Sequence, residues 1–371
     1  MEIIKVNKAL NVLSLCDGMS CGQIALIESG YKINKYFASE IDKNAIKVTQ
    51  DNFPDTIQIG DVMNFVEEVD DELIVKGDAL SNLPKIDLVI FGSPCCSLSK
   101  ATAGRKEYNN GLKGVSWLFY PCNAILQWIK VNNNPDVLFM IENVDSNNKT
   151  DIAKITKAVG VEPVLIDSNI FSAQDRKRLY WTNIPIAPLP LASKQVIKDI
   201  MDKDVPEKYF YEQNFDFHGN SKKVIATLHI NGHDILKRVN NINFKSPTLT
   251  GCRGGNKQKK ILDRNRCRKL TPNEYRKLQT IPDWYKMNVA DSHIYNMCGD
   301  GWTIEVIKHI FKGIKKVGDF NGNNSDSKRR KHNTFSHNRR ASKLFRVVRR
   351  RQNLYMIQAL IELHIIDLIF I

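Results

Sequence analysis

Several familiar signatures are missing from this 371-residue sequence. Its eight cysteines form no C-x-x-C pair and no paired spacing typical of zinc, so we expect neither a metal site nor a disulfide framework. The turn after the first candidate strand is neither G-x-G-x-x-G nor a Walker loop, which disfavours a site for nucleoside phosphates. The N-terminal stretch carries charges ahead of a short apolar run, so we expect no cleavable signal.

Acidic residues are scarce in the C-terminal part. The formal net charge is +14, and residues 321–371 contribute +8 of it with eleven Lys/Arg against three Asp/Glu. The rest of the chain is therefore only mildly basic, apart from residues 251–268, which hold seven Lys/Arg and one Asp. Basic charge suits a polyanionic partner such as a nucleic acid, although a charged run is equally a solvated surface.

The first half of the chain alternates short apolar runs with helical stretches at 22–30 and 118–131. Such alternation predicts an α/β fold with a doubly wound, mostly parallel sheet, whose ligands bind at the carboxyl ends of the strands. The candidate strands are 11–16, 35–40, 56–61, 86–91, 137–143, 162–167 and 178–183.

The character of the sequence changes near residue 184, where a proline-rich stretch leads into a polar segment without strong periodicity. Regular patterns return at Thr271, which is expected to cap a helix that begins at Pro272. An apolar helical face follows in 299–316. These changes predict four regions. Residues 1–184 form the first part of the catalytic and cofactor-binding domain, and 185–269 form a small irregular recognition region. Residues 270–316 return to the catalytic domain, and 317–371 are a basic linker and tail.

Polar residues follow three successive candidate strands. Gly18, Ser20 and Gly22 form a turn that lets the backbone approach a ligand, Glu40 ends the next strand, and Asp61 ends the third. A carboxylate in the position of Glu40 suits ribose hydroxyls, so the series favours a nucleoside-containing cofactor. Taken singly, the turn is compatible with an empty tight turn, and each acid with a helix cap.

Further chemical groups follow later strands. Cys95 and Cys96 come directly after Pro94, and vicinal cysteines can be nucleophiles, ligands or small apolar residues. Glu142 ends an apolar strand, which favours a proton donor, although a loop cap is the alternative. Arg176 and Arg178 lead into a strand with two-residue spacing and can point together at an anion or a base edge; two surface arginines are the plain reading.

In this order the motifs resemble those of the cytosine-C5 DNA methyltransferases, over roughly residues 10–316. The matching segments are DGMSCG, ASEID, GDV, GSPC, ENV, QDRKR, RKLTPNEYRKLQTIP and GDGW. The details are most similar to the animal de novo type and its phage and bacterial relatives. The resemblance implies the class I S-adenosylmethionine-dependent methyltransferase fold and double-stranded DNA as substrate.

The resemblance also implies the reaction. The Cys95 thiolate would attack C6 of a cytosine flipped out of the duplex, while Glu142 protonates N3. The methyl group of S-adenosyl-L-methionine would then go to C5, leaving S-adenosyl-L-homocysteine, with no metal involved. Arg178 would contact the cytosine O2, with Arg176 beside it. Cys96 falls at a variable position and is expected to be a bystander.

Binding residues follow from the same resemblance. The cofactor site would comprise Asp17, Gly18, Met19, Ser20, Gly22, Glu40, Ile41, Asp61, Val62, Pro94, Asp300 and Trp302; Asp300 replaces the usual asparagine and loses its amide donor. The DNA contacts would comprise Ser97, Ser99, Arg105, Lys106, Asn143, Arg253, Lys257, Lys259, Lys260 and Arg264. Several of these lie in loop 97–116, whose lysines, arginines and glycines suit a lid.

The sequence is also compatible with three other hypotheses. An RNA cytosine-5 methyltransferase that acts on tRNA is disfavoured because the chain lacks a CFT tripeptide. A catalytically inactive DNA-binding relative would not need Cys95, Glu142 and Arg178. A dinucleotide oxidoreductase would need the missing glycine turn. The expected setting is the cytoplasm of a bacterial cell or a phage-infected host, with a restriction endonuclease as the partner to test for.

Overall fold

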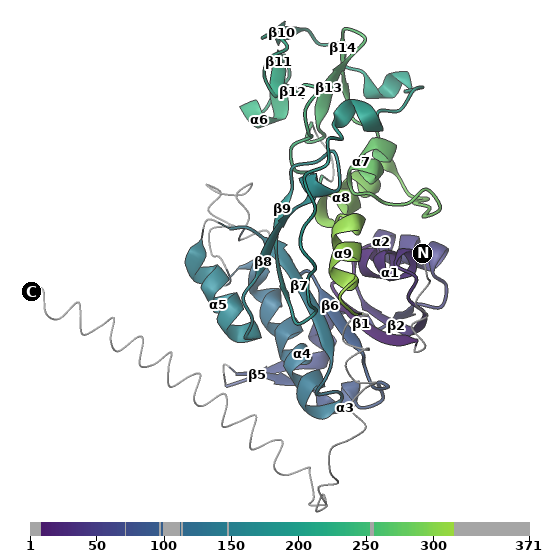
Figure 1. The fold of residues 1–371 in the computed structure, drawn as a ribbon, viewed down its shortest axis with the longest axis vertical. Helices are drawn as coiled ribbons and strands as arrows, with labels where there is room; N and C mark the ends of the chain where they lie inside the picture. Colours follow the sequence, from purple (N-terminus) through teal and green to yellow (C-terminus); the bar gives the residue numbers. More distant parts are fainter. Residues whose placement is uncertain are drawn as a thin grey trace, which may run out of the picture. The chain divides into compact units, whose positions relative to one another are not determined.

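The computed structural model describes residues 9–70, 72–95, 98, 112, 114–146, 148–252 and 256–314. Its centre is a seven-stranded sheet of order β3-β2-β1-β6-β7-β9-β8 (Figure 1). The first five in that order are mutually parallel, whereas β9 is antiparallel to both β7 and β8. The strands are β1 (Leu10–Leu15), β2 (Ile33–Ser39), β3 (Ile57–Gln58), β6 (Leu88–Phe91), β7 (Leu138–Val144), β8 (Val164–Asp167) and β9 (Lys177–Thr182). The predicted mostly parallel sheet is confirmed, and β3 is shorter than the sequence suggests.

Helices cover both faces of this sheet. Neighbouring strand residues such as Val12 and Leu13 belong to two different apolar clusters, because successive side chains point to opposite faces. One cluster contains residues of α1, α2 and α9, and the other contains residues of α4 and α5. These helices are α1 (Cys21–Glu28), α2 (Lys43–Asn52), α4 (Phe119–Asn132), α5 (Lys149–Val159) and α9 (Ile304–Phe311). The doubly wound fold is therefore confirmed.

The first helix lies unusually close to the sheet. A Cβ atom on Gly22 would stand 2.1 Å from the Ile90 side chain and 3.3 Å from the Tyr36 hydroxyl. A larger residue would force the Ile90 side chain to change its rotamer or α1 to move. Gly22 thus lets α1 begin in contact with the side chains of the central sheet.

A second, five-stranded sheet of order β10-β11-β12-β13-β14 lies within the polar middle segment (Figure 1). The sequence predicts little regular structure there, because these strands are only three to five residues long and are too short to show a period. Their bounds are β10 (Phe215–Phe217), β11 (Val224–Leu228), β12 (Arg238–Asn240), β13 (Lys260–Asp263) and β14 (Arg266–Lys269), with α6 (Asp234–Lys237) before β12. The domain boundaries at 184, 269 and 316 stay predictions.

The helix expected after Thr271 is present as α7 (Pro272–Leu278). The Thr271 hydroxyl accepts from the Glu274 N–H, and the Glu274 carboxylate accepts from the Thr271 N–H, which completes the predicted capping box. The same carboxylate takes two bonds from the fully buried guanidinium of Arg268 at 2.7 and 2.8 Å. Arg268 in turn reaches Asp263 at 2.7 Å, so α7 is tied to β13 and β14.

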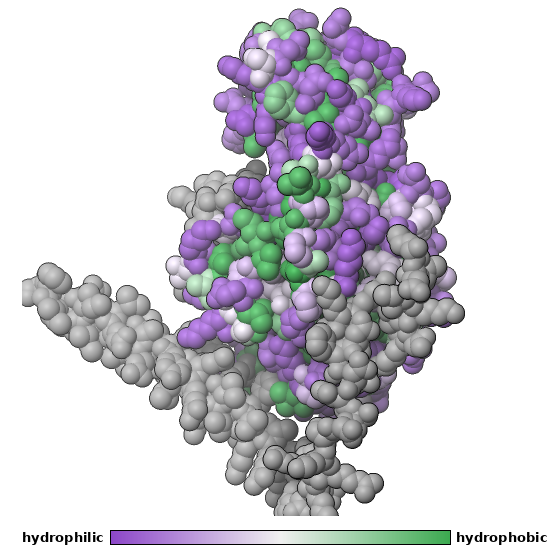
Figure 2. Space-filling model, in the orientation of Figure 1, coloured by the Kyte–Doolittle hydropathy of each residue, from purple (hydrophilic) through white to green (hydrophobic). Residues whose placement is uncertain are grey.

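The remaining elements are a small hairpin of β4 (Val66–Val69) and β5 (Glu72–Val75), α3 (Gly77–Leu80) and α8 (Asp291–Asp300). Figure 2 shows apolar side chains gathered where β8 lies in Figure 1, and Val164 and Leu165 of that edge strand are exposed. No helix in the described part of the chain is long and apolar enough to cross a membrane.

Candidate active site

The loop after β1 folds back on itself at the carboxyl edge of the sheet. Cys16, Gly18 and Ser20 all have left-handed φ angles, of 52°, 60° and 55°. The turn directs the Gly18 N–H to the Glu40 carboxylate at 2.7 Å. Glu40 therefore links the ends of β1 and β2, as expected for groups that follow adjacent parallel strands.

Asp17 is held at the bottom of this loop. Its carboxylate accepts from the Tyr36 hydroxyl at 2.8 Å and from the Ser20 hydroxyl. Burial raises the pKa of Asp17 to about 6, the hydrogen bonds from Ser14, Ser20 and Tyr36 work against this rise, and the Glu40 charge adds to it. The carboxyl group is therefore ionised at neutral pH but close to titration.

The next two strand ends complete this edge. Glu40 also accepts from the N–H groups of Ile41 and Asp42, both at 2.8 Å, and the Ile41 side chain is 70% exposed. Asp61 caps a short helical turn through the Met63 N–H at 2.9 Å, and Val62 is buried behind it. An exposed isoleucine beside a carboxylate presents one apolar surface and one hydrogen-bond acceptor to the same space.

The Gly-Ser-Pro-Cys segment follows β6 and lies beside the end of β7. Ser93 is buried and accepts from the Asn143 side-chain amide at both its carbonyl (3.4 Å) and its hydroxyl (3.3 Å). Pro94 and Cys95 are half-buried. Asn143, predicted to contact DNA, is itself buried, and its visible bonds brace the loop that carries Cys95.

Glu142 is a buried carboxylate near the end of β7, and each of its oxygens has a partner. Its Oε1 lies 2.9 Å from Nε of Arg178, and its Oε2 accepts from the indole N–H of Trp302 at 3.1 Å. Arg178 reaches it diagonally across the antiparallel β7–β9 pair, where Val144 is opposite Arg178. The structure therefore brings Glu142, Arg178 and Trp302 together.

The sequence suggested that Arg176 and Arg178 point together at an anion or a base edge. In the structure the Arg176 side chain is bound to main-chain carbonyls instead. Its guanidinium donates to the carbonyls of Leu249 at 2.8 Å, Gly299 at 3.1 Å and Gly301 at 2.8 Å, and its side chain is buried. Burial and the nearby Arg178 charge lower its pKa to about 10, so it stays protonated at neutral pH. Its bonds fix the main chain on either side of Asp300.

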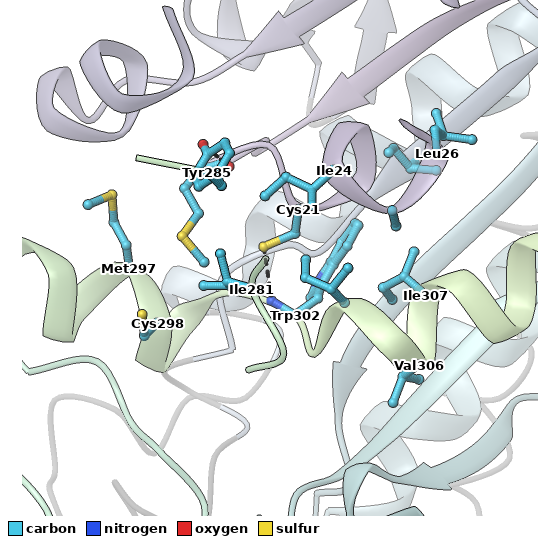
Figure 3. Close-up of a cluster of buried hydrophobic side chains, with 14 of the residues drawn as sticks. Cys21, Ile24, Leu26, Ile281, Tyr285, Met297, Cys298, Trp302, Val306 and Ile307 are labelled. Atoms are coloured by element: carbon cyan, nitrogen blue, oxygen red, sulfur yellow. Dashed lines mark hydrogen bonds between the residues drawn. The ribbon is translucent and has the colours of Figure 1, made fainter. Parts of the chain in front are cut away.

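Of three further residues of the predicted cofactor site, Met19 and Trp302 are buried and Asp300 is exposed. Met19 is buried, and its carbonyl accepts from the Tyr285 hydroxyl at 2.7 Å. The Asp300 carboxylate lies over Gly251, where an added Cβ atom would stand 2.5 Å from its Oδ1. Trp302 donates its main-chain N–H to the Cys21 sulfur at 3.4 Å, as Figure 3 shows. The cofactor contacts of these residues, like those of every other residue assigned to the cofactor site, stay predictions.

The basic residues of 251–268 divide into exposed and buried groups. Lys257 and Arg264 are exposed, Arg264 at the left-handed turn between β13 and β14 and bonded to the Lys203 carbonyl at 2.9 Å. Lys260, predicted to contact DNA, is 1% exposed and donates to the carbonyls of Asn256 and Gln258. That prediction is wrong for Lys260, because β13 turns its side chain inward.

Lys259 is half-buried beside Lys260, and burial lowers its pKa to about 8. Its main-chain N–H donates to the Tyr275 hydroxyl at 2.8 Å, which ties the strand to α7. The other predicted DNA contacts lie outside the described residues, as do Cys96 and most of loop 97–116; these contacts are Ser97, Ser99, Arg105, Lys106 and Arg253.

The sequence patterns do not predict a buried cluster of amide side chains that lies behind the site. Gln279 is fully buried and donates to the Gly301 carbonyl at 3.1 Å, while its Oε1 accepts from Thr303 at 2.7 Å and Gln174 at 3.3 Å. Both glutamines belong to motifs quoted above, but nothing in their spacing says that they meet. In the described part of the chain, no group of three or more His, Cys, Asp or Glu is placed to hold a metal ion.

Comparison with known proteins identifies the family. A family model described as C-5 cytosine-specific DNA methylase matches residues 10–316. Type II methyltransferase M.Bsp6I of Bacillus sp. (strain RFL6) is 26% identical over 334 residues, which cover 83% of this chain and 99% of the relative. Orphan methyltransferase M.SPBetaI of Bacillus phage SPbeta is 22% identical and covers 82% of this chain and 97% of the relative.

Solved structures support the same fold. The S. pombe Dnmt2 methyltransferase superposes with a TM-score of 0.57 at 16% identity, covering 84% of this chain and 100% of that chain. The Entamoeba histolytica methyltransferase EhMeth gives 0.59 at 14% identity, covering 84% and 99%. With the family model spanning most of its length, the chain belongs to the C-5 cytosine-specific DNA methylases and is an S-adenosylmethionine-dependent DNA (cytosine-5) methyltransferase.

Proposed function

We propose that Cys95 is the nucleophile of this methyltransferase and that Glu142 and Arg178 hold the target cytosine. The observation that carries the proposal is the pair of buried Glu142 and largely buried Arg178, 2.9 Å apart, at the end of the strand next to the Cys95 segment. Phe91 pairs with Ile141, and Asn143 is bonded to Ser93, so the two segments leave the sheet side by side. Both therefore face the same substrate volume.

In this proposal each residue has one task. The Cys95 thiolate sulfur forms a bond to C6 of the flipped cytosine, while Glu142, carrying a proton on a lone pair that neither Arg178 nor Trp302 occupies, passes that proton to N3, and Arg178 donates to O2. The electron pair that reaches C5 then makes C5 nucleophilic. After methylation, a water molecule takes the C5 proton, the C5–H electrons form the C5–C6 double bond, and the S–C6 electron pair leaves with Cys95 as a thiolate. The N3 proton returns to Glu142. S-Adenosylmethionine supplies the methyl group when it is bound.

The loops after β1, β2 and β3 fit that cofactor. A carboxylate accepts roughly four hydrogen bonds, and Glu40 uses three on backbone N–H groups, which leaves capacity for a ribose hydroxyl. Ile41 offers an exposed apolar surface for an adenine ring. Asp17 supplies negative charge for a cofactor that carries a sulfonium and an ammonium group. We assign these three residues to the cofactor.

The affinity for S-adenosylmethionine should depend on pH through Asp17. Its pKa of about 6 means that the carboxyl is charged above pH 6 and neutral below it. If the charged form binds the cationic cofactor, the Kd should rise about tenfold between pH 7.5 and pH 5. Calorimetric titration across this range checks the prediction. Asp17→Asn should bind weakly at every pH, whereas Asp55→Asn, at an exposed position, should keep the wild-type profile. A flat wild-type profile would exclude Asp17 from the binding site.

The substrate in this proposal is double-stranded DNA, gripped in part by exposed basic residues of the small sheet such as Lys257 and Arg264. We also propose that a restriction endonuclease accompanies this enzyme, because the similar protein M.Bsp6I is named a type II methyltransferase. The direct test offers tritiated S-adenosylmethionine to the enzyme with duplex DNA and with tRNA in parallel. We expect label in DNA alone; label only in tRNA would overturn the proposal.

A further inference from the structure

The carboxylate of Glu142 has a second buried partner besides Arg178. The indole N–H of Trp302 donates to Oε2 at 3.1 Å, while Arg178 occupies Oε1. Glu142 is 7% exposed and Trp302 is 9% exposed, so little water competes with either bond. A hydrogen bond to a carboxylate in such surroundings is one of the stronger polar contacts in a protein.

The contact depends on a glycine in the segment before Cys95. A Cβ atom on Gly92 would stand 2.9 Å from the Trp302 Nε1 and 3.0 Å from the Glu142 Oε2. Any larger residue would therefore push into both partners at the point where they meet. Gly92 is not among the glycines with left-handed φ, so its backbone conformation does not require glycine. It serves this contact by leaving space for the two side chains.

The indole is also held from behind. Its residue follows Gly301, whose carbonyl accepts from Arg176 at 2.8 Å and from Gln279 at 3.1 Å. The main-chain N–H of Trp302 donates to the Cys21 sulfur, and α9 begins two residues later (Figure 3). These bonds fix the main chain that carries the indole, and the buried side chain has little room to turn away from Glu142.

We propose that Trp302 is a positioning residue for Glu142, an inference that rests on the proposed role of Glu142 at N3 of cytosine. An indole N–H can only donate, so it holds Oε2 as an acceptor. Together with Arg178 it fixes both carboxylate oxygens and therefore the plane of the carboxyl group. The remaining lone pairs then face the base in one orientation. Trp302 acts on the methylation step through Glu142, in addition to any packing against the cofactor.

The test is Trp302→Phe, which keeps an aromatic ring but removes the N–H. We expect the single-turnover rate of methyl transfer to duplex DNA to fall about tenfold, the effect of one hydrogen bond to a charged group. The Kd for S-adenosylmethionine should stay within about twofold, because the ring still packs. Trp284→Phe is the matched control: its N–H also donates to a carboxylate, that of Glu28 at 2.7 Å, but on the surface, and its rate should not change.

Substitutions of Glu142 separate this inference from the proposed role of Glu142. In the Glu142→Ala background, Trp302→Phe should slow the reaction less than twofold, because the oxygen that accepts the indole N–H is gone. An unchanged rate in Glu142→Gln alone would refute the role of Glu142. A normal rate in Trp302→Phe, an equal loss in both backgrounds, or a loss explained wholly by a weaker cofactor Kd would refute the positioning role. If Trp302→Phe fails to fold, benzothienylalanine at this position removes only the N–H and decides the same question.

Discussion

Cys95→Ser is expected to abolish methyl transfer and to leave S-adenosylmethionine binding intact. A serine hydroxyl ionises far less readily than a thiol, whose ordinary pKa is about 8.5, so the attack on C6 loses its nucleophile. We expect a fall of at least about a thousandfold in turnover, as is typical when a nucleophile is removed. Tritium transfer to duplex DNA measures the rate, and calorimetry measures the cofactor Kd.

Cys96→Ser is the matched control, one residue along the chain. It lies outside the described residues, and we expect its turnover to stay within a few-fold of the wild type. A duplex containing 5-fluorocytosine should trap a covalent complex with the wild type and with Cys96→Ser, but not with Cys95→Ser. The reverse pattern would show that Cys96 is the nucleophile.

Glu274→Ala is expected to destabilise the protein by about 3–5 kcal/mol. Glu274 is fully buried and accepts two bonds from Arg268, one from the Thr271 N–H and one from the Asp202 N–H. Its removal leaves the buried guanidinium with Asp263 as its remaining carboxylate partner and removes one of the two hydrogen bonds of the α7 capping box. Urea unfolding followed by tryptophan fluorescence measures the loss.

Glu207→Ala removes the same kind of pair from the surface of the same region. Glu207 and Arg266 are joined by two bonds but are largely exposed, so water replaces the lost contact. Its unfolding midpoint should match that of the wild type. Equal midpoints for both variants would show that the buried pair does not anchor the small sheet to α7.

The sequence predicted the large sheet well because its strands are continuous apolar runs. The central strands β1, β6 and β7 are buried on both faces, so residues such as Val89 and Ile90 are both apolar and the run stands out. Glu40, Glu142 and Cys95 could be placed near strand ends because each lies at or just after the end of such an apolar run. Parallel strands bring their carboxyl ends to one edge, and this rule needs no knowledge of side-chain contacts.

The exposure of individual lysine and arginine side chains could not be predicted in this way. Lys257 and Lys260 look alike in the sequence, yet one is exposed and the other is buried against two carbonyls. Which way a residue faces depends on where β13 begins to pair, and this short strand shows no period. The bond between Trp302 and Glu142 joins residues 160 positions apart, which no local pattern specifies.

The contact between Trp302 and Cys21 also bears on when the enzyme becomes active during its synthesis. It joins residues 281 positions apart, and the helix that follows Trp302 packs on the first helix of the sheet. A nascent chain therefore exposes the loops of Asp17 and Glu40 long before the indole that adjoins Glu142 has been made. Such distant contacts form late and slowly. A chain still attached to the ribosome before residue 302 should therefore be unable to methylate DNA, so that activity appears only with the nearly finished protein.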